Sequence, residues 1–450
     1  MIDTNDSEFL SRIEDKSLLS KVMPGAAAAA MINAGDIIGI SGFTPCGYPK
    51  ITMHELAERM KQTPFQVDIW TGASTGSQID TELVAVNGGR VRMPYQTNAN
   101  LRKAINNGQV SYYDLHLSHV AQQVRAGFFT NVKGERVTGP DFAVVEACKI
   151  GPNGEIYPTT AIGNSPVYVD TAKKVIVEVN TTQPLGLVGM ADIYMRKNPP
   201  HCEPIPILHA GDRIGTPYIK CDPSKIVAIV PCDMPDVTRA LAPLDDDAEA
   251  MGNNLVEFLT NEVKHGRLPE NLLPLQSGVG NVANAVIHGL VESQFKNLSV
   301  YTEVIQDGMF ELIDKDKIDM ISGTSLSPSP EGLKRFYDNI EKYSVLRATM
   351  AIERSDVCLI MIDATEGVTE QDTKVAGLAH EAGKACIIVV NKWDAIEKDG
   401  KTMDKMREDI RRDLSYMTYA PILFISAATG QRVPRLFELI NYVHSQACTR

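Results

Sequence analysis

The sequence is short of positive charge, of cysteine pairs and of long apolar runs. It has 44 Lys and Arg against 56 Asp and Glu, a net charge of −12, which argues against nonspecific nucleic-acid binding. Its eight cysteines form no CxxC pair or Cys/His cluster at metal-ligand spacing. No apolar run is long enough to span a bilayer, and the acidic N-terminus MIDTNDSEFL lacks a signal pattern. We therefore expect a cytoplasmic protein with reduced thiols and no metal, membrane or nucleic-acid partner.

Length and composition predict a multidomain α/β protein. The 450 residues have 44% hydrophobic and 22% charged content, typical of an ordinary globular chain with two or three domains. Short β-branched runs alternate with helical stretches, which predicts open, mainly parallel sheets with helices on their faces. The expected strands of the first half are residues 36–41, 67–70, 142–146, 175–179 and 225–230.

The most informative stretch is residues 276–307, QSGVGNVANAVIHGLVESQFKNLSVYTEVIQD. Gly278 and Gly280 predict a tight turn that opens an amphipathic helix, whose N-terminus suits an anion such as a phosphate. Residues 298–301 read as a buried strand that delivers Glu303 to its C-terminal edge, where ligands bind in open α/β sheets. Taken alone, a glutamate after a strand is usually a solvated loop charge, and a GxG turn is a weak signal.

Several motifs together resemble the class I coenzyme A transferases, specifically the acetyl-CoA hydrolase and succinyl-CoA:acetate CoA-transferase family. They are GFTP and GYPK in residues 42–50, GNSP from residue 163, RIGTPYI from residue 213, and SGVGNVANAV followed by YTEVIQDG. The resemblance implies that Glu303 is the nucleophile, which forms a glutamyl-CoA thioester. It also implies that acyl-CoA and small carboxylic acids are the substrates, and it suggests a homodimer. The CoA site would include four residues of the turn and helix: Gly278, Gly280, Asn281 and Asn284.

Other polar residues follow strands in the same part of the chain. The glycine-rich loops at residues 42–50 and 71–76 are expected to line a shared crevice at one sheet edge. Gly163, Asn164 and Ser165 are candidate donors to substrate. Glu178, near the end of a strand, is either a site acid or an internal cap, and its position does not decide between the two.

From about residue 341 the resemblance changes. Two buried strands are expected at residues 357–362 and 387–390, with a helix between them over 369–382. NKWD at residues 391–394 directly follows the second strand, and SAATG lies further on at residues 426–430. This part resembles the second G domain of the ribosome-assembly GTPase Der (EngA). The resemblance implies guanine contacts from these residues: Asn391, Lys392, Asp394, Ser426 and Ala427.

The phosphate-binding part of a GTPase is missing from the sequence. No GxxxxGK[ST] segment is present, and DATEG at residues 363–367 has the wrong spacing for the magnesium-side DxxG motif. Phosphoryl transfer depends on that positioning, so we expect at most weak binding of GTP or GDP, without hydrolysis.

The expected domains are residues 1–221 (first CoA-transferase domain), 222–340 (truncated second domain with the nucleophile) and 341–450 (partial GTPase-like domain lacking the P-loop). No Gly/Ser-rich or Pro-rich linker separates the last two domains. Both are incomplete at their junction, and each truncation is expected to expose apolar sheet edges unless the two fragments cover each other. Three functions stay open: a CoA-transferase or acetyl-CoA hydrolase, a guanine-nucleotide-binding fragment, and an inactive chimera.

Overall fold

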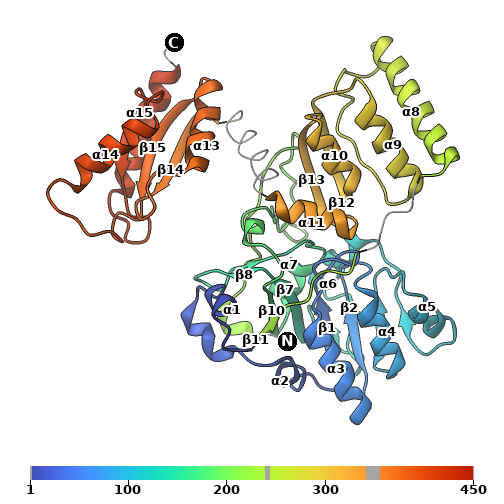
Figure 1. The fold of residues 1–450 in the computed structure, drawn as a ribbon. Helices are drawn as coiled ribbons and strands as arrows, with labels where there is room; N and C mark the ends of the chain where they lie inside the picture. Colours follow the sequence, from blue (N-terminus) through green and yellow to red (C-terminus); the bar gives the residue numbers. More distant parts are fainter. Residues whose placement is uncertain (1–2, 239–243, 341–354, 449–450) are drawn as a thin grey trace. The chain divides into compact units, whose positions relative to one another are not determined.

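The computed structural model describes residues 3–238, 244–340 and 355–448. The chain divides into two compact units, Met1–Ile340 and Glu341–Arg450. Both are α/β, with parallel sheets and helices packed on them (Figure 1). The expected start of the GTPase-like part falls in residues 341–354, outside the described residues.

The first unit contains a seven-stranded sheet in the order β11-β10-β7-β1-β2-β3-β4, parallel throughout. The central strands are buried on both faces, which explains their continuous β-branched runs. The strands are β1 (Ile37–Ile40), β2 (Val67–Trp70), β3 (Gly89–Met93), β4 (Ser111–Tyr112), β7 (Phe142–Ala147), β10 (Lys174–Asn180) and β11 (Ile226–Cys232). The five strands expected from the sequence are all present, within one or two residues at each end.

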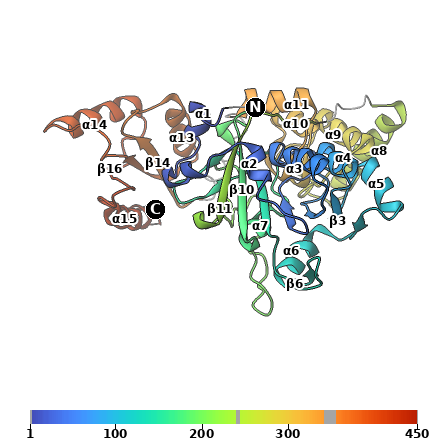
Figure 2. The same cartoon turned by 90° about the horizontal axis from the view of Figure 1, so that it is seen from below.

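Helices cover both faces of this sheet (Figure 2). One face packs on α2 (Gly25–Ala29), α3 (Ile51–Gln62) and α4 (Ser77–Ala85), and the other on α6 (Leu117–Arg125) and α7 (Ser165–Thr171). The remaining elements before residue 226 are α1 (Ser7–Ser11), α5 (Ala99–Asn106), the 3-10 turns η1 (Lys16–Lys21), η2 (Leu185–Leu187) and η3 (Pro223–Lys225), and the short strands β5 (Phe129–Thr130), β6 (Arg136–Val137), β8 (Lys149–Ile150) and β9 (Ile156–Tyr157).

The first sheet includes a strand that lies beyond residue 221. β11 pairs in parallel with β10 over Val175↔Ile226 to Asn180↔Cys232, so residues 226–232 belong to the first sheet. The boundary expected after residue 221 thus precedes the last strand of the first sheet.

The rest of the first unit is smaller. β12 (Leu298–Ile305) and β13 (Ile318–Leu326) pair in parallel. Helices α8 (Asp246–Lys264), α9 (Asn281–Glu292) and α10 (Asp307–Asp314) lie beside one another next to these strands, and α11 (Pro330–Asp338) follows β13 (Figure 1). α8 packs closely on α9, since a Cβ on Gly252 would lie 2.6 Å from the backbone oxygen of Ala285.

The second unit is a three-stranded parallel sheet in the order β14-β15-β16, formed by Val357–Asp363, Ala385–Asn391 and Ile422–Phe424. Helices α13 (Glu370–Glu381) and α14 (Thr402–Asp413) cover one face, and α15 (Val433–Cys448) packs on the other. The expected strands and the helix between them are confirmed, and Thr369 begins that helix with a capping box to Asp372.

Apolar side chains are exposed on β14. Leu359 and Met361 are 37% and 46% exposed, and β14 is an edge strand of the described sheet. These two side chains lie on the same face of β14.

The described residues lack two features, a membrane-crossing helix and a metal-binding group. No helix there combines the length and apolar composition needed to cross a bilayer. In the same residues, no group of three His, Cys, Asp or Glu side chains is placed to hold a metal ion.

A buried carboxylate joins four segments of the first domain. Asp236 Oδ1 accepts from the Gly47 N–H at 3.1 Å and lies 2.9 Å from Lys50 Nζ. Its Oδ2 accepts from Thr160 Oγ1 at 2.5 Å and from Gln183 Nε2 at 3.2 Å. The side chains of Lys50, Thr160, Gln183 and Asp236 are all buried. Asp236 therefore fixes the loops that follow β1, β9 and β10 relative to one another.

Lys50 is the cation of this cluster. Its Nζ also lies 2.5 Å from Glu146 Oε2, and both side chains are buried. Burial alone lowers the pKa of Lys50, but the carboxylates of Glu146 and Asp236 raise it well above its usual value. Burial raises the pKa of Glu146; Lys50 lowers it, and Asp236 adds to the increase. One buried cation is thus shared by two carboxylates.

We expect Lys50→Met to destabilise the first unit by about 3–5 kcal/mol, because it leaves two buried carboxylates without their cation. The measurement is urea unfolding followed by Trp70 fluorescence in a Trp393→Phe background, since the two tryptophans lie in different units. The control is Lys61→Met, which removes an exposed pair with Glu58 and should leave the free energy of unfolding nearly unchanged. Equal losses in the two variants would contradict this account of the cluster.

Candidate active site

Glu303 lies on β12, and the pleat of that strand directs its side chain outward. Thr302 and Val304 are buried, whereas Tyr301 and Glu303 are exposed. Side chains alternate between the two faces of a strand, so Glu303 shares the open face with Tyr301. The sequence placed Glu303 at the end of a shorter strand; the structure places it inside the strand, two residues before its end.

The glycine turn is tied to the strand on both sides of Glu303. Thr302 Oγ1 donates to the Ser277 carbonyl at 2.9 Å, and Gln306 Nε2 donates to the Gly278 carbonyl at 2.8 Å. Leu275 runs alongside β12, accepting from the Tyr301 N–H at 2.9 Å. The turn and the strand of Glu303 therefore form one local unit.

Gly280 begins helix α9 as its N-cap. Its φ of +135° is a conformation that favours glycine, and no side chain caps the helix there. The helix start therefore keeps N–H groups and the positive end of its dipole for another partner. Asn281 is the first residue of the helix, and its side chain lies outside what the structure describes; Asn284 is half-buried and donates its N–H to the Gly280 carbonyl.

The inward side of β12 contacts loops of the first domain. Val304 packs in one cluster with Phe43, Cys46, Ala73 and Ala161. Backbone hydrogen bonds join the neighbouring strand β13 to the loop after β9, from the Leu326 N–H to the Thr160 carbonyl at 2.7 Å and from the Ile162 N–H to the Thr324 carbonyl at 3.2 Å. The strand of Glu303 is thus seated on the loops that follow β1, β2 and β9.

Three of these loops meet through glycine. A Cβ on Gly163 would lie 2.9 Å from the Gly42 oxygen and 3.0 Å from Gly72 Cα, so a larger residue would separate the loops. The two loops that the sequence assigned to a shared crevice are therefore neighbours. Asn164 and Ser165, predicted as donors to substrate, are buried and hydrogen-bonded inside the protein, to Thr71 and Ile162.

Glu178 is an internal cap. Its carboxylate accepts from three successive backbone N–H groups at the start of α3: Lys50 at 2.7 Å, Ile51 at 3.1 Å and Thr52 at 2.5 Å. The side chain is fully buried. Of the two readings left open by the sequence, the structure supports the cap, because the helix start uses the carboxylate oxygens.

Sequence reasoning missed the Lys50–Glu146–Asp236 cluster. Lys50 ends the GYPK motif, which was noted only as part of a loop, and Asp236 follows the last strand of the sheet. The sequence signal that could have indicated the cluster was a lysine and two acidic residues, each near the end of an expected strand. α11 reaches the cluster as well, since the Tyr337 hydroxyl donates to Gln183 Oε1 at 2.6 Å.

In the second unit the predicted guanine-contact residues converge at the ends of β15 and β16. Asn391 Oδ1 accepts from the Ala427 N–H at 2.9 Å. A hydrogen bond from Ser426 lowers the pKa of Asp394. Lys392 Nζ lies 2.6 Å from Asp363, and hydrogen bonds from Lys392 and Thr365 lower the pKa of Asp363 to about 2.

Comparison with protein families matches both parts of the chain. The acetyl-CoA hydrolase/transferase N-terminal domain matches residues 9–231. The elongation factor Tu GTP binding domain matches residues 342–445, and the 50S ribosome-binding GTPase family matches residues 281–392.

Curated relatives match the first three quarters of the chain. It is 50% identical over 331 residues to the succinyl-CoA:acetate CoA-transferase of Clostridium kluyveri, covering 73% of this chain and 60% of the relative. It is 39% identical over 338 residues to the acetyl-CoA hydrolase of Schizosaccharomyces pombe, covering 74% and 64%. For the propanoyl-CoA:succinate CoA transferase of Escherichia coli, the identity is 39% over 328 residues, covering 72% and 65%. The chain thus spans less than two thirds of the length of these relatives.

Among solved structures, RipA from Yersinia pestis superposes with a TM-score of 0.52 at 16% identity, covering 90% of this chain and 85% of that one. This likeness concerns the fold alone. Together, the matches show an α/β chain whose first part is similar to CoA-transferases and whose last part is similar to GTPase domains. More particularly, residues 9–231 match the acetyl-CoA hydrolase/transferase N-terminal domain, and about three quarters of the chain is similar to curated CoA-transferases and acetyl-CoA hydrolases.

We expect Gly280→Ala to loosen the turn before α9, because alanine is strained at a φ of +135° even where no atom lies within 4 Å of the added Cβ. Amide hydrogen exchange over residues 276–292 should become faster by about tenfold, equivalent to roughly 1.4 kcal/mol of lost local stability. Gly278→Ala is the matched control, since its surroundings are equally open and its φ is ordinary. Unchanged exchange in Gly280→Ala would show that the turn does not depend on that conformation.

Proposed function

We propose that this chain exchanges CoA between an acyl-CoA and a carboxylic acid, or hydrolyses the acyl-CoA, through Glu303. The observation that carries the proposal is the exposed Glu303 carboxylate, on a strand fixed to a glycine turn and seated on the loops of a parallel sheet. Similarity to curated relatives supports the reaction class, because those relatives are named as CoA-transferases and acetyl-CoA hydrolases.

The chemistry needs a carboxylate that first attacks as a nucleophile and then, once acylated, is itself attacked at its carbonyl carbon. A Glu303 oxygen attacks the thioester carbonyl, and the C–S bond breaks to release the CoA thiolate and leave an acyl-glutamyl anhydride. The thiolate then attacks the glutamyl carbonyl, which releases the first carboxylate and leaves a glutamyl-CoA thioester. A second carboxylate reverses the two steps. Such a sequence gives ping-pong kinetics.

The turn and helix next to β12 are the proposed CoA-binding segment, through Gly278, Gly280, Asn281 and Asn284. The uncapped start of α9 offers N–H donors and a positive dipole end to an anionic group of CoA. With a chain charge of −12, the attraction for this anion must come from such local donors.

Exposure of Glu303 bears on the choice between transfer and hydrolysis. Both intermediates are acyl compounds that water can cleave, so transfer requires that bound substrate or protein exclude water. The open face of β12 favours hydrolysis whenever the acceptor acid is absent. We propose acetate-sized to succinate-sized acids as acceptors and a homodimer, following the family resemblance. We also propose a cytoplasmic location, following the unpaired cysteine pattern of the sequence.

Glu303→Gln should reduce both acyl-CoA hydrolysis and CoA exchange with labelled acetate by at least about a thousandfold, because an amide cannot form the anhydride. Release of CoA thiol, measured with a chromogenic disulfide reagent, reports the first reaction. Tyr301→Phe is the control: it lies on the same face of β12, two residues away, and should retain activity within about threefold. Substantial turnover by Glu303→Gln would remove Glu303 from the mechanism.

A second candidate function is binding of a guanine nucleotide by the second unit. The hydrogen bonds that hold Asn391 to Ala427 and Asp394 to Ser426 favour it, because they arrange one amide, one carboxylate and one backbone N–H at the same sheet edge. Asp394 would accept from the guanine ring, and the Ala427 region would donate to its oxygen.

Asp394→Asn should weaken binding of a fluorescent GDP analogue by at least about tenfold. The new amide N–H₂ would face the N–H donors of guanine, which the Asp394 carboxylate is expected to accept. The same variant should gain affinity for xanthosine diphosphate, which carries an oxygen in place of the amino group. Asp399→Asn, in an exposed loop, is the control. Absence of saturable GDP binding to the unaltered chain would eliminate this function.

A further inference from the structure

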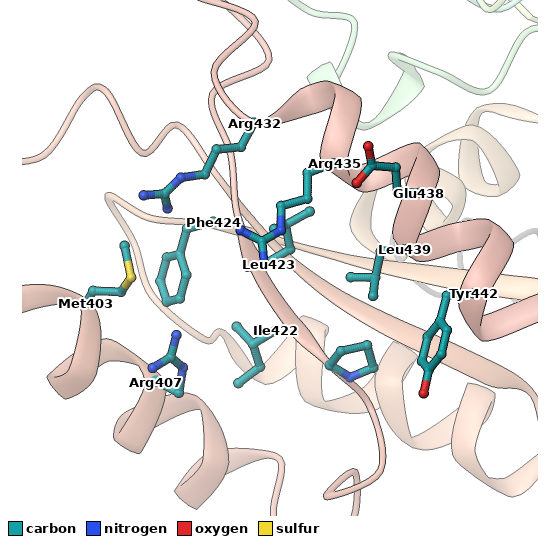
Figure 3. A pocket seen from close by; sticks show the side chains of 11 residues that line it. Met403, Arg407, Ile422, Leu423, Phe424, Arg432, Arg435, Glu438, Leu439 and Tyr442 are labelled. Atoms are coloured by element: carbon teal, nitrogen blue, oxygen red, sulfur yellow. The ribbon is translucent and has the colours of Figure 1, made fainter. Parts of the chain in front are cut away.

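A groove of about 520 Å³ runs beside β16, between α14 and α15 in the second unit (Figure 3). Its floor is apolar, formed by Ile422, Leu423, Phe424 and Leu439. Met403, Pro421 and Tyr442 extend this surface. The groove contains none of the five residues predicted to contact guanine, so it is a separate feature of this unit.

β16 presents a free backbone edge to the groove. It is the last strand in the order β14-β15-β16, and its pairing with β15 uses the Pro421 carbonyl and the Ile425 N–H. Alternate residues of a parallel strand point their N–H and C=O groups to opposite sides, so those of Ile422 and Phe424 point away from β15. No strand of the described residues pairs with that side, and an exposed edge can accept another chain as an added strand.

Positive charge surrounds the groove. Figure 3 shows the guanidinium groups of Arg407, Arg432 and Arg435 gathered around Phe424. Arg407 pairs with exposed Asp404 at 3.2 Å, while within the described ranges Arg432 and Arg435 form no ion pair with an acidic side chain. Glu438 is the one acid of the lining. This concentration of arginine is notable in a chain whose net charge is −12.

We propose that this groove binds an extended acidic segment of another protein, which adds as a strand to the free edge of β16. The backbone of that segment would pair with Ile422 and Phe424, its apolar side chains would cover the floor, and its carboxylates would meet Arg407, Arg432 and Arg435. Arginine favours carboxylates through paired N–H donors, and main-chain pairing gives affinity without demanding one exact sequence.

Two other occupants fit less well. A second copy of this chain that paired β16 with β16 would bring the arginines of both copies together, and like charges at such an interface oppose association. A nucleic acid would match the arginines, but it cannot pair with a strand edge, and nucleic-acid sites rely on a larger positive surface than three arginines beside one glutamate.

The test is fluorescence anisotropy of the full chain with a fluorescein-labelled nine-residue peptide of alternating glutamate and valine. We expect saturable binding that weakens at least about tenfold in Arg432→Glu/Arg435→Glu. The control Lys405→Glu/Arg412→Glu makes the same charge change on exposed positions of α14 outside the groove lining and should bind as the unaltered chain does. All four side chains are exposed, so both variants should fold, and circular dichroism checks this.

A peptide with N-methyl groups on alternate residues separates strand addition from simple charge attraction, and we expect it to bind at least about tenfold more weakly. Any of four results would overturn the proposal: equal binding of a lysine–valine peptide, equal binding of the methylated peptide, unchanged binding to Arg432→Glu/Arg435→Glu, or displacement of the peptide by a lower concentration of oligouridylate. A dimer that the same double variant dissociates would assign the groove to a second copy instead.

Discussion

The buried carboxylate of Asp236 is the interaction on which the geometry of the first unit depends. It accepts hydrogen bonds from the Gly47 backbone, Thr160 and Gln183, and it forms an ion pair with Lys50. Two of the loops fixed in this way contact β12 or β13 directly, through Cys46 and Thr160. The position of Glu303 therefore depends on the buried charges of Asp236 and Lys50, which fix the loops that contact its strand.

A buried cation shared by two carboxylates specifies geometry more than it adds stability. Replacing such a group with apolar side chains often leaves stability unchanged, whereas removing one partner leaves an uncompensated charge. In this protein the cluster places the ends of three strands and, through Tyr337 and Gln183, helix α11 in fixed relation. The glycine contacts at Gly42, Gly72 and Gly163 bring the loop backbones together, and the cluster keeps them there.

Much of the fold was predictable, since periodicity and β-branched runs are local signals. VDIW at 67–70 and the helix after Thr369 were located almost to the residue. The glycine turn before α9 was also evident. The Asp236 cluster was not, because its members are brought together only by the sheet. Glu178 shows the same limit: a carboxylate near a strand end is a cap or a reactive group depending on a helix start 128 residues away. The pairing of β11 with β10 was not predicted either, because strand order is set by tertiary packing and not by local sequence.

The central claim is that the carboxylate of Glu303 forms a covalent bond with CoA. The most direct measurement is the intact mass of the purified full chain after mixing with acetyl-CoA, followed by peptide mapping of residues 298–305. The account predicts a mass increase corresponding to CoA, less the water lost in forming the thioester, located on Glu303 and reversed by added acetate. A folded chain that turns over acetyl-CoA without an adduct, or with the adduct on another residue, would contradict it.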